Sequence, residues 1–140
     1  MGVLAHWKQG HKTEAILIEK LSELGYEVLK PLNGSLRYDL VIEDDNGQFW
    51  RIQCKTAWIE KRSGVLRFHT ASTGGAATRA NNRQGYKGQI DYFAVYAPDL
   101  KECFLIPIDH AKGTEMRLRL EPTKNNQKKG INYAYDYLLQ

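Results

Sequence analysis

Apolar residues recur at helical spacing near the start of the chain, over residues 11–24. The apolar stripe comprises Leu17, Ile18, Leu21 and Leu24. Gly25 follows the last of these residues and is a natural helix stop. The pattern therefore predicts a helix over residues 11–24. Glu14 falls on the same stripe, so its carboxylate is expected to point towards the core side of this helix.

A β-hairpin is predicted downstream, between strands at residues 38–43 and 49–58. The segment that joins them, residues 44–47, reads Asp-Asp-Asn-Gly and is a strong signal for a tight turn. The second strand alternates, with Trp50, Ile52 and Cys54 on one face and Arg51, Gln53 and Lys55 on the other. Because strand side chains alternate between faces, Gln53 and Lys55 are expected to lie side by side.

The rest of the chain is mainly β-strand in pattern. Short apolar runs predict strands at residues 26–29, 65–71, 92–96, 103–108 and 116–120, and an aromatic segment predicts a closing helix at 132–139. Residues 72–89 are polar without periodicity and are predicted to form a long loop or a partly ordered helix. This order favours an α/β fold, in one domain over residues 1–140, with a mixed β-sheet flanked by helices.

Composition and charge narrow the function classes. The chain is 42% apolar and 26% charged, which is ordinary for a globular protein, and no apolar run approaches the ~18 residues of a membrane span. The start of the chain lacks the apolar core of a signal peptide, so a cytoplasmic protein is expected. The formal net charge is +4, and residues 61–90 hold six Lys or Arg and no Asp or Glu. A polyanionic partner is consistent with this distribution.

Four polar residues are expected to converge where the helix meets the hairpin: Glu14, Asp39, Gln53 and Lys55. Mg²⁺ needs only one or two carboxylates beside water and phosphate oxygens. Asp39 supplies a carboxylate, Glu14 a second one directly or through water, and Gln53 a neutral amide oxygen. Lys55 can hold an attacking water or stabilise charge on a phosphate. This set of groups suits metal-assisted hydrolysis of a phosphodiester.

These residues resemble a known family. Tyr38-Asp39, then Gln53-Cys54-Lys55 on the next strand, with a glutamate on the preceding helix, look like the signature of the PD-(D/E)XK nuclease superfamily. Within it, the chain is most similar to the small group I intron-associated homing endonucleases, over roughly residues 11–108. The resemblance implies a restriction-endonuclease-like core.

The resemblance also implies an activity and residue roles. The activity would be Mg²⁺-dependent cleavage of double-stranded DNA, with Mn²⁺ as an expected substitute. Asp39 would be the central metal ligand, and the backbone carbonyl of Cys54 a further one. Lys55 would be the lysine of the signature, and Glu14 would match the helix glutamate found in many members.

Two positions depart from the signature and leave alternatives open. Tyr38 stands where the signature has Pro, and Gln53 where it usually has Asp or Glu, which removes a charge from the metal site. The first hypothesis is a sequence-specific endonuclease of the homing or restriction-like type. The alternatives are a Holliday junction resolvase of the same fold, a catalytically silent DNA-binding module, and an oligomeric scaffold with fortuitous acids.

Candidate DNA contacts follow the predicted catalytic hairpin. Arg, Lys and Asn side chains bind phosphates and base edges, and the best candidates are Arg83, Lys87, Arg79, Asn82, Lys61 and Arg62. A second group comprises Lys124, Lys128 and Lys129. Cutting both strands of a duplex needs two active sites, so a homodimer or homotetramer is expected.

Overall fold

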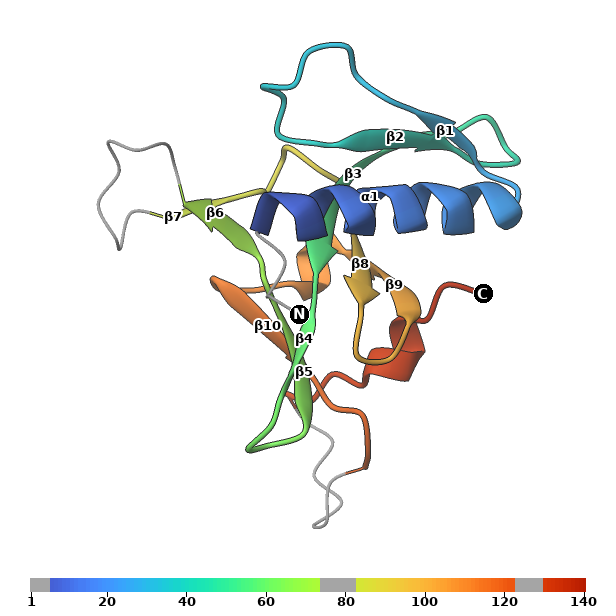
Figure 1. The fold of residues 1–140 in the computed structure, drawn as a ribbon. Coiled ribbons are helices and arrows are strands. Elements are labelled where there is room, and N and C mark those ends of the chain that lie inside the picture. The colour runs from blue at the N-terminus through green and yellow to red at the C-terminus, as the bar shows by residue number, and fades with distance from the viewer. Residues whose placement is uncertain (1–5, 74–82, 123–129) are drawn as a thin grey trace.

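A helix lies across one face of the main sheet in the computed structural model, which describes residues 6–73, 83–122 and 130–140 (Figure 1). This helix, α1, spans His6–Glu23 and so begins five residues before the predicted start. Its first turns were missed because they bury no apolar stripe: Trp7 is 65% exposed. The predicted stop is confirmed, since Gly25 has a positive φ of 97° and Tyr26 N donates to Leu21 O at 3.2 Å.

The main sheet is mixed. Its strands, in spatial order, are β1 (Glu27–Leu29), β2 (Leu40–Glu43), β3 (Phe49–Thr56), β8 (Tyr92–Ala97) and β9 (Glu102–Pro107). The β3–β8 pair is parallel and the other pairs are antiparallel. An α/β arrangement with a mixed sheet is therefore confirmed. The predicted turn is also present, with Gly47 at a φ of 76° and Gly47 N donating to Asp44 O at 3.0 Å.

Each face of this sheet supports a separate part of the core. On one face, the fully buried Leu17 and Leu21 of α1 pack with Ile52 of β3 and with Cys54, which is half-buried. On the other face, a larger cluster forms around Phe93 and also includes side chains of the second sheet. Truncating a buried leucine such as Leu17 to alanine is expected to cost about 2–5 kcal/mol of stability. The alternation along β3 therefore separates α1 from the face that carries Gln53 and Lys55.

A second sheet continues from the end of β3, in the order β10-β5-β4. It contains β4 (Trp58–Glu60), β5 (Val65–His69) and β10 (Glu115–Leu118). The prediction of one strand over residues 49–58 is therefore wrong, because the chain turns at the fully buried Ala57 and enters another sheet. Ala57 N still donates to Tyr96 O of β8 at 2.9 Å, so backbone pairing continues through the corner.

The prediction of a loop or helix over residues 72–89 is wrong for the described ends of this insert, and residues 74–82 lie outside the described residues. Its two ends pair as an antiparallel ribbon, β6 (Ala71–Thr73) with β7 (Arg83–Gly85). The predicted closing helix at 132–139 is also wrong, since this segment forms only a short 3-10 helix, η2 (Ala134–Tyr137). Another 3-10 turn, η1 (Ile108–His110), follows β9. No helix in the described ranges is long and apolar enough to cross a membrane.

Candidate active site

Asp39 is fixed at the entrance to β2 by backbone bonds to β3. Its N–H donates to Ile52 O at 2.8 Å, and its Oδ2 accepts the N–H of Cys54 at 3.0 Å. Its Oδ1 accepts no hydrogen bond within the described ranges of the chain. The register of the hairpin thus holds one carboxylate oxygen in place and leaves the other available to a ligand.

The environment of Asp39 raises its pKa above the ordinary value of 3.8. Burial is the main cause, and the nearby Glu14 carboxylate acts in the same direction. The Cys54 N–H and the ammonium groups of Lys55 and Lys30 lower the pKa but do not prevail. A cation beside Asp39 would stabilise the ionised carboxylate and so offset the cost of burying its negative charge near Glu14. Because a proton competes with the cation, metal binding should decline on acidification at a higher pH than for an ordinary aspartate.

Glu14 reaches the same region from α1. Its side chain is 21% exposed, and its Oε1 is buried. That oxygen lies 2.8 Å from the ammonium of Lys30, an ion pair that raises the pKa of Lys30 through hydrogen bonding and charge. Lys30 was not among the predicted site residues. It directly follows β1, and only the pairing of β1 with β2 brings it beside the helix.

Lys55 and Gln53 extend from the face of β3 opposite α1. Lys55 Nζ donates to Tyr86 Oη at 3.3 Å and lies 5.1 Å from the centroid of the Tyr86 ring. The half-buried amide of Gln53 has no hydrogen bond to a described residue. The side chains of Glu14 and Lys55 therefore approach from opposite faces of the sheet. Asp39 lies at the entrance to β2, and the charges of both side chains affect its pKa.

The donor set of this site fits a hard divalent cation. No cluster of three His, Cys, Asp or Glu side chains occurs in the described part of the chain, as a zinc site would require. Burial raises the pKa of the Cys54 thiol well above its ordinary value, so this thiol stays protonated and is a poor ligand. Two carboxylates, one amide and backbone carbonyls remain, and oxygen ligands of this kind suit Mg²⁺.

Asp91 is an aspartate whose carboxylate is already hydrogen-bonded and paired with a cation in this fold. Its Oδ2 accepts Arg51 N at 2.7 Å, and its Oδ1 lies 3.2 Å from Arg51 Nη2. Burial acts to raise the pKa of Asp91, but the hydrogen bonds from Arg51 prevail and lower it. Asp91 therefore already has a cationic partner, whereas the pKa of Asp39 remains raised.

The predicted DNA contacts are only partly described. Lys87 is exposed after β7, and Lys61 and Arg62 are exposed in the turn between β4 and β5. Arg83 belongs to β7. The remaining candidates lie outside the described residues: Arg79, Asn82, Lys124, Lys128 and Lys129.

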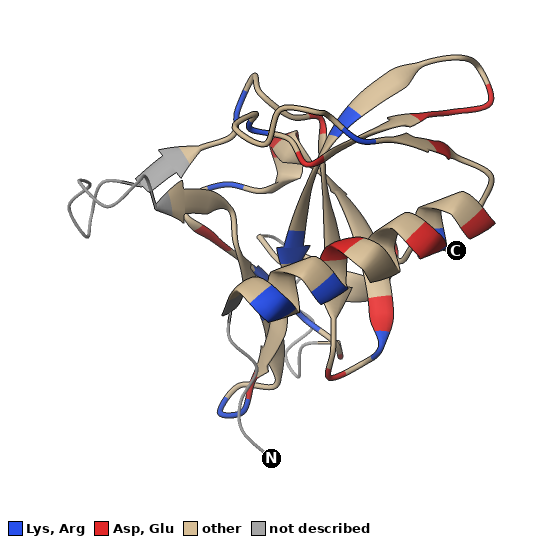
Figure 2. Ribbon diagram, turned by 45° about the horizontal axis from the view of Figure 1, so that its top comes forward, with Lys and Arg blue, Asp and Glu red and all other residues tan. Residues whose placement is uncertain are grey.

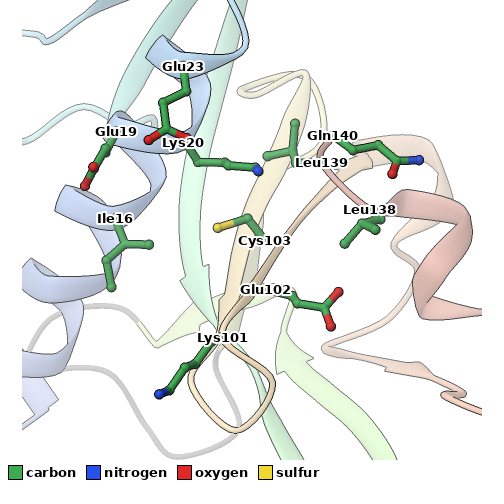
Figure 3. A pocket seen from close by; sticks show the side chains of 10 residues that line it. All are labelled: Ile16, Glu19, Lys20, Glu23, Lys101, Glu102, Cys103, Leu138, Leu139 and Gln140. Atoms are coloured by element: carbon green, nitrogen blue, oxygen red, sulfur yellow. The ribbon is translucent and has the colours of Figure 1, made fainter.

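Two other charged regions are poorly suited to phosphate. On the second sheet, Arg67 and Arg117 pair with Glu60 and Glu115 at 3.0–3.8 Å, so their charges are already neutralised. A cavity of about 360 Å³ lies between α1, β9 and the end of the chain (Figure 3). Its charged lining holds three carboxylates and two ammonium groups: Glu19, Glu23, Glu102, Lys20 and Lys101. By contrast, the part of α1 that precedes Glu14 carries two lysines, Lys8 and Lys12, and no acid (Figure 2).

Comparisons with known proteins agree with the fold. A family model described as "PD-(D/E)XK endonuclease" matches residues 5–140. Among solved structures, the chain is similar to the bacterial homing endonuclease I-Ssp6803I, with 27% sequence identity and a TM-score of 0.76. That match covers 96% of this chain and 89% of the other, so the predicted restriction-endonuclease-like fold is confirmed. No curated protein sequence matches the chain.

Proposed function

Because this chain belongs to the PD-(D/E)XK endonuclease family, we propose that it is a divalent-metal-dependent endonuclease that cuts double-stranded DNA at specific sequences. The observation that carries the proposal is the environment of the Asp39 carboxylate. Its carboxylate is held by β3, has a raised pKa, and lies between the charges of Glu14 and Lys55. The similarity to a homing endonuclease supports sequence-specific cleavage.

Each site residue has a chemical role in this proposal. Asp39, the amide oxygen of Gln53 and the backbone carbonyl of Cys54 hold the cation, with Glu14 as a direct ligand or through water. A bound Mg²⁺, or Mn²⁺ in its place, supplies Lewis acidity and lowers the pKa of coordinated water. Lys55 orients the attacking water or stabilises the negative charge that grows on the phosphate. Water gives up a proton as its oxygen bonds to phosphorus, a P–O bond of the DNA backbone breaks, and the leaving oxygen takes up a proton.

The proposed substrate and assembly follow from charge and geometry. Exposed lysines and arginines, including Lys87, Lys61 and Arg62, bind the DNA backbone. The lysines in the first half of α1 add positive charge near Glu14. The described residues form one such site, so cutting both strands requires a homodimer or homotetramer.

The function is tested with DNA whose sequence is not chosen in advance. The protein is incubated with a random-sequence duplex library and with a four-way junction, each with and without Mg²⁺, and cut ends are sequenced. We expect Mg²⁺-dependent cuts at a small set of related duplex sequences. Cuts in the junction alone would instead identify a resolvase. Salt-sensitive binding without cleavage would identify a silent DNA-binding module, and no binding would exclude both DNA functions.

Gln53→Glu restores the charge of the usual signature. We expect this variant to keep cleavage within about tenfold of the parent but to change the ratio of rates in Mg²⁺ and Mn²⁺, because a carboxylate binds hard cations more strongly than an amide does. The measurement is the cleavage rate against the concentration of each metal, with Gln48→Glu in the exposed hairpin turn as control. An unchanged metal dependence would show that residue 53 does not bind the cation.

A further inference from the structure

Tyr86 lies under Lys55 and was not among the predicted site residues. The residue is 4% exposed, and its ring packs edge-on against Phe93 with centroids 5.6 Å apart. Its hydroxyl oxygen is 3.3 Å from Lys55 Nζ, from which it accepts a hydrogen bond. The ring is therefore anchored in the core, while its one polar atom meets the ammonium of the proposed catalytic lysine.

Arg37 also packs against Tyr86. Its guanidinium carbon lies 4.0 Å from the centroid of the ring, a close cation–π contact. Its Nη1 donates to Ser72 Oγ at 2.6 Å and its Nη2 to Gly85 O at 3.0 Å, on the two strands of the β6–β7 ribbon. Its Nε donates to Gln89 Oε1 at 2.7 Å. These contacts fix the guanidinium plane against the ring.

These contacts form a continuous path between the ribbon and the site. Arg37 precedes Asp39 by two residues, so the same short segment carries the proposed metal ligand and the group that covers Tyr86. Lysine has a flexible four-carbon side chain, so its ammonium stays in one position only when a neighbouring group holds it there. A residue that limits this freedom before the substrate arrives favours a reactive geometry.

We propose that Tyr86 is a positioning residue for Lys55, and that Arg37 holds Tyr86 in place for this task. The inference rests on the proposed nuclease function, in which Lys55 acts on the phosphate or the attacking water. Tyr86 does not touch the reacting atoms. It acts through the ammonium of Lys55, and its hydroxyl is the atom that matters.

Tyr86→Phe removes that hydroxyl while keeping the ring. We expect the single-turnover cleavage rate on a duplex from the library to fall about tenfold, as for the loss of one hydrogen bond to a charged group. The dissociation constant for DNA and the melting temperature should change no more than they do in the control variant, Tyr137→Phe. That control loses a tyrosine hydroxyl bonded to His110 Nδ1 at 2.8 Å, outside the site. A parental rate in Tyr86→Phe would overturn the proposal, as would equal losses in rate, binding and stability.

A second measurement does not depend on cleavage. Acetylation of lysines by a mild acylating reagent, read by mass spectrometry, should be at least about twofold faster at Lys55 in Tyr86→Phe than in the parent, because a hydrogen-bonded ammonium is less available. The exposed Lys101 should react equally in both proteins. If the parent cuts no DNA but Lys55 is acetylated faster in Tyr86→Phe, the result would support the contact and refute the nuclease function. Unchanged acetylation would refute the positioning role.

Arg37→Lys tests the other half of the path. Lysine keeps the positive charge but lacks the planar fork that donates to three partners at once. We expect the single-turnover rate to fall in this variant too, with the acetylation of Lys55 shifted in the same direction as in Tyr86→Phe. If Arg37→Lys leaves both readouts at their parental values, Arg37 has no part in placing Lys55.

Discussion

Replacing Lys55 by methionine is expected to lower the single-turnover rate of DNA cleavage by about 10²–10³-fold or more, the usual loss when one group that stabilises the transition state is removed. Methionine keeps an unbranched side chain of similar length, so the packing along β3 should survive. Lys55 is half-buried and is held by Tyr86 Oη at 3.3 Å, which places its ammonium inside the site rather than on the outer surface. DNA affinity should therefore change by no more than a few-fold.

The rate and the affinity of Lys55→Met are measured separately, by single-turnover cleavage in Mg²⁺ and by DNA binding in Ca²⁺, which binds oxygen ligands. The matched control is Lys101→Met, which removes an exposed lysine between β8 and β9. A loss of affinity equal to the loss of rate would make Lys55 a binding residue only. Cleavage at the parental rate would remove Lys55 from the site.

The hairpin could be predicted from the sequence because its determinants are local. The turn after Asp44 and the alternation along β3 fix the register, and that register brings Asp39 N to Ile52 O. The face shared by Gln53 and Lys55 follows from the same alternation. Local patterns therefore predicted the strand pair that carries the proposed metal ligands. The corner at Ala57 was missed because residues 49–58 contain no Gly or Pro to mark a break.

The neighbours that complete the site could not be predicted in this way. Lys30 and Tyr86 meet Glu14 and Lys55 only after β1 has paired with β2 and after the chain has returned from the second sheet. No spacing in the sequence records such contacts. Similarly, Asp39 and Asp91 both stand just before a strand, and only the tertiary structure shows that Arg51 neutralises one of them.

Asp39→Asn is expected to abolish detectable cleavage, because it removes the charged group around which the cation binds while keeping an oxygen that can accept the Cys54 N–H. The same change should raise the stability of the metal-free protein at neutral pH. The pKa of Asp39 is raised in the folded state, so the folded protein holds the proton more tightly than the unfolded chain does. Stability therefore falls as pH rises from the ordinary value of 3.8 through the raised pKa, and asparagine escapes this loss.

Thermal melting with and without Mg²⁺ separates the two effects of Asp39→Asn. Without metal, the variant should melt above the parent at neutral pH, and the difference should vanish below the ordinary aspartate pKa. With Mg²⁺, the parent should gain stability in proportion to ln(1 + c/Kd), where c is the free Mg²⁺ concentration, and the variant should gain little. Asp44→Asn serves as control, since that carboxylate accepts the N–H groups of Asn46 and Gln48 and has a lowered pKa, chiefly through the Trp50 hydrogen bond. This control should lose stability and keep its response to Mg²⁺. An Asp39→Asn protein that is less stable than the parent without metal, yet still responds to Mg²⁺, would place the cation elsewhere.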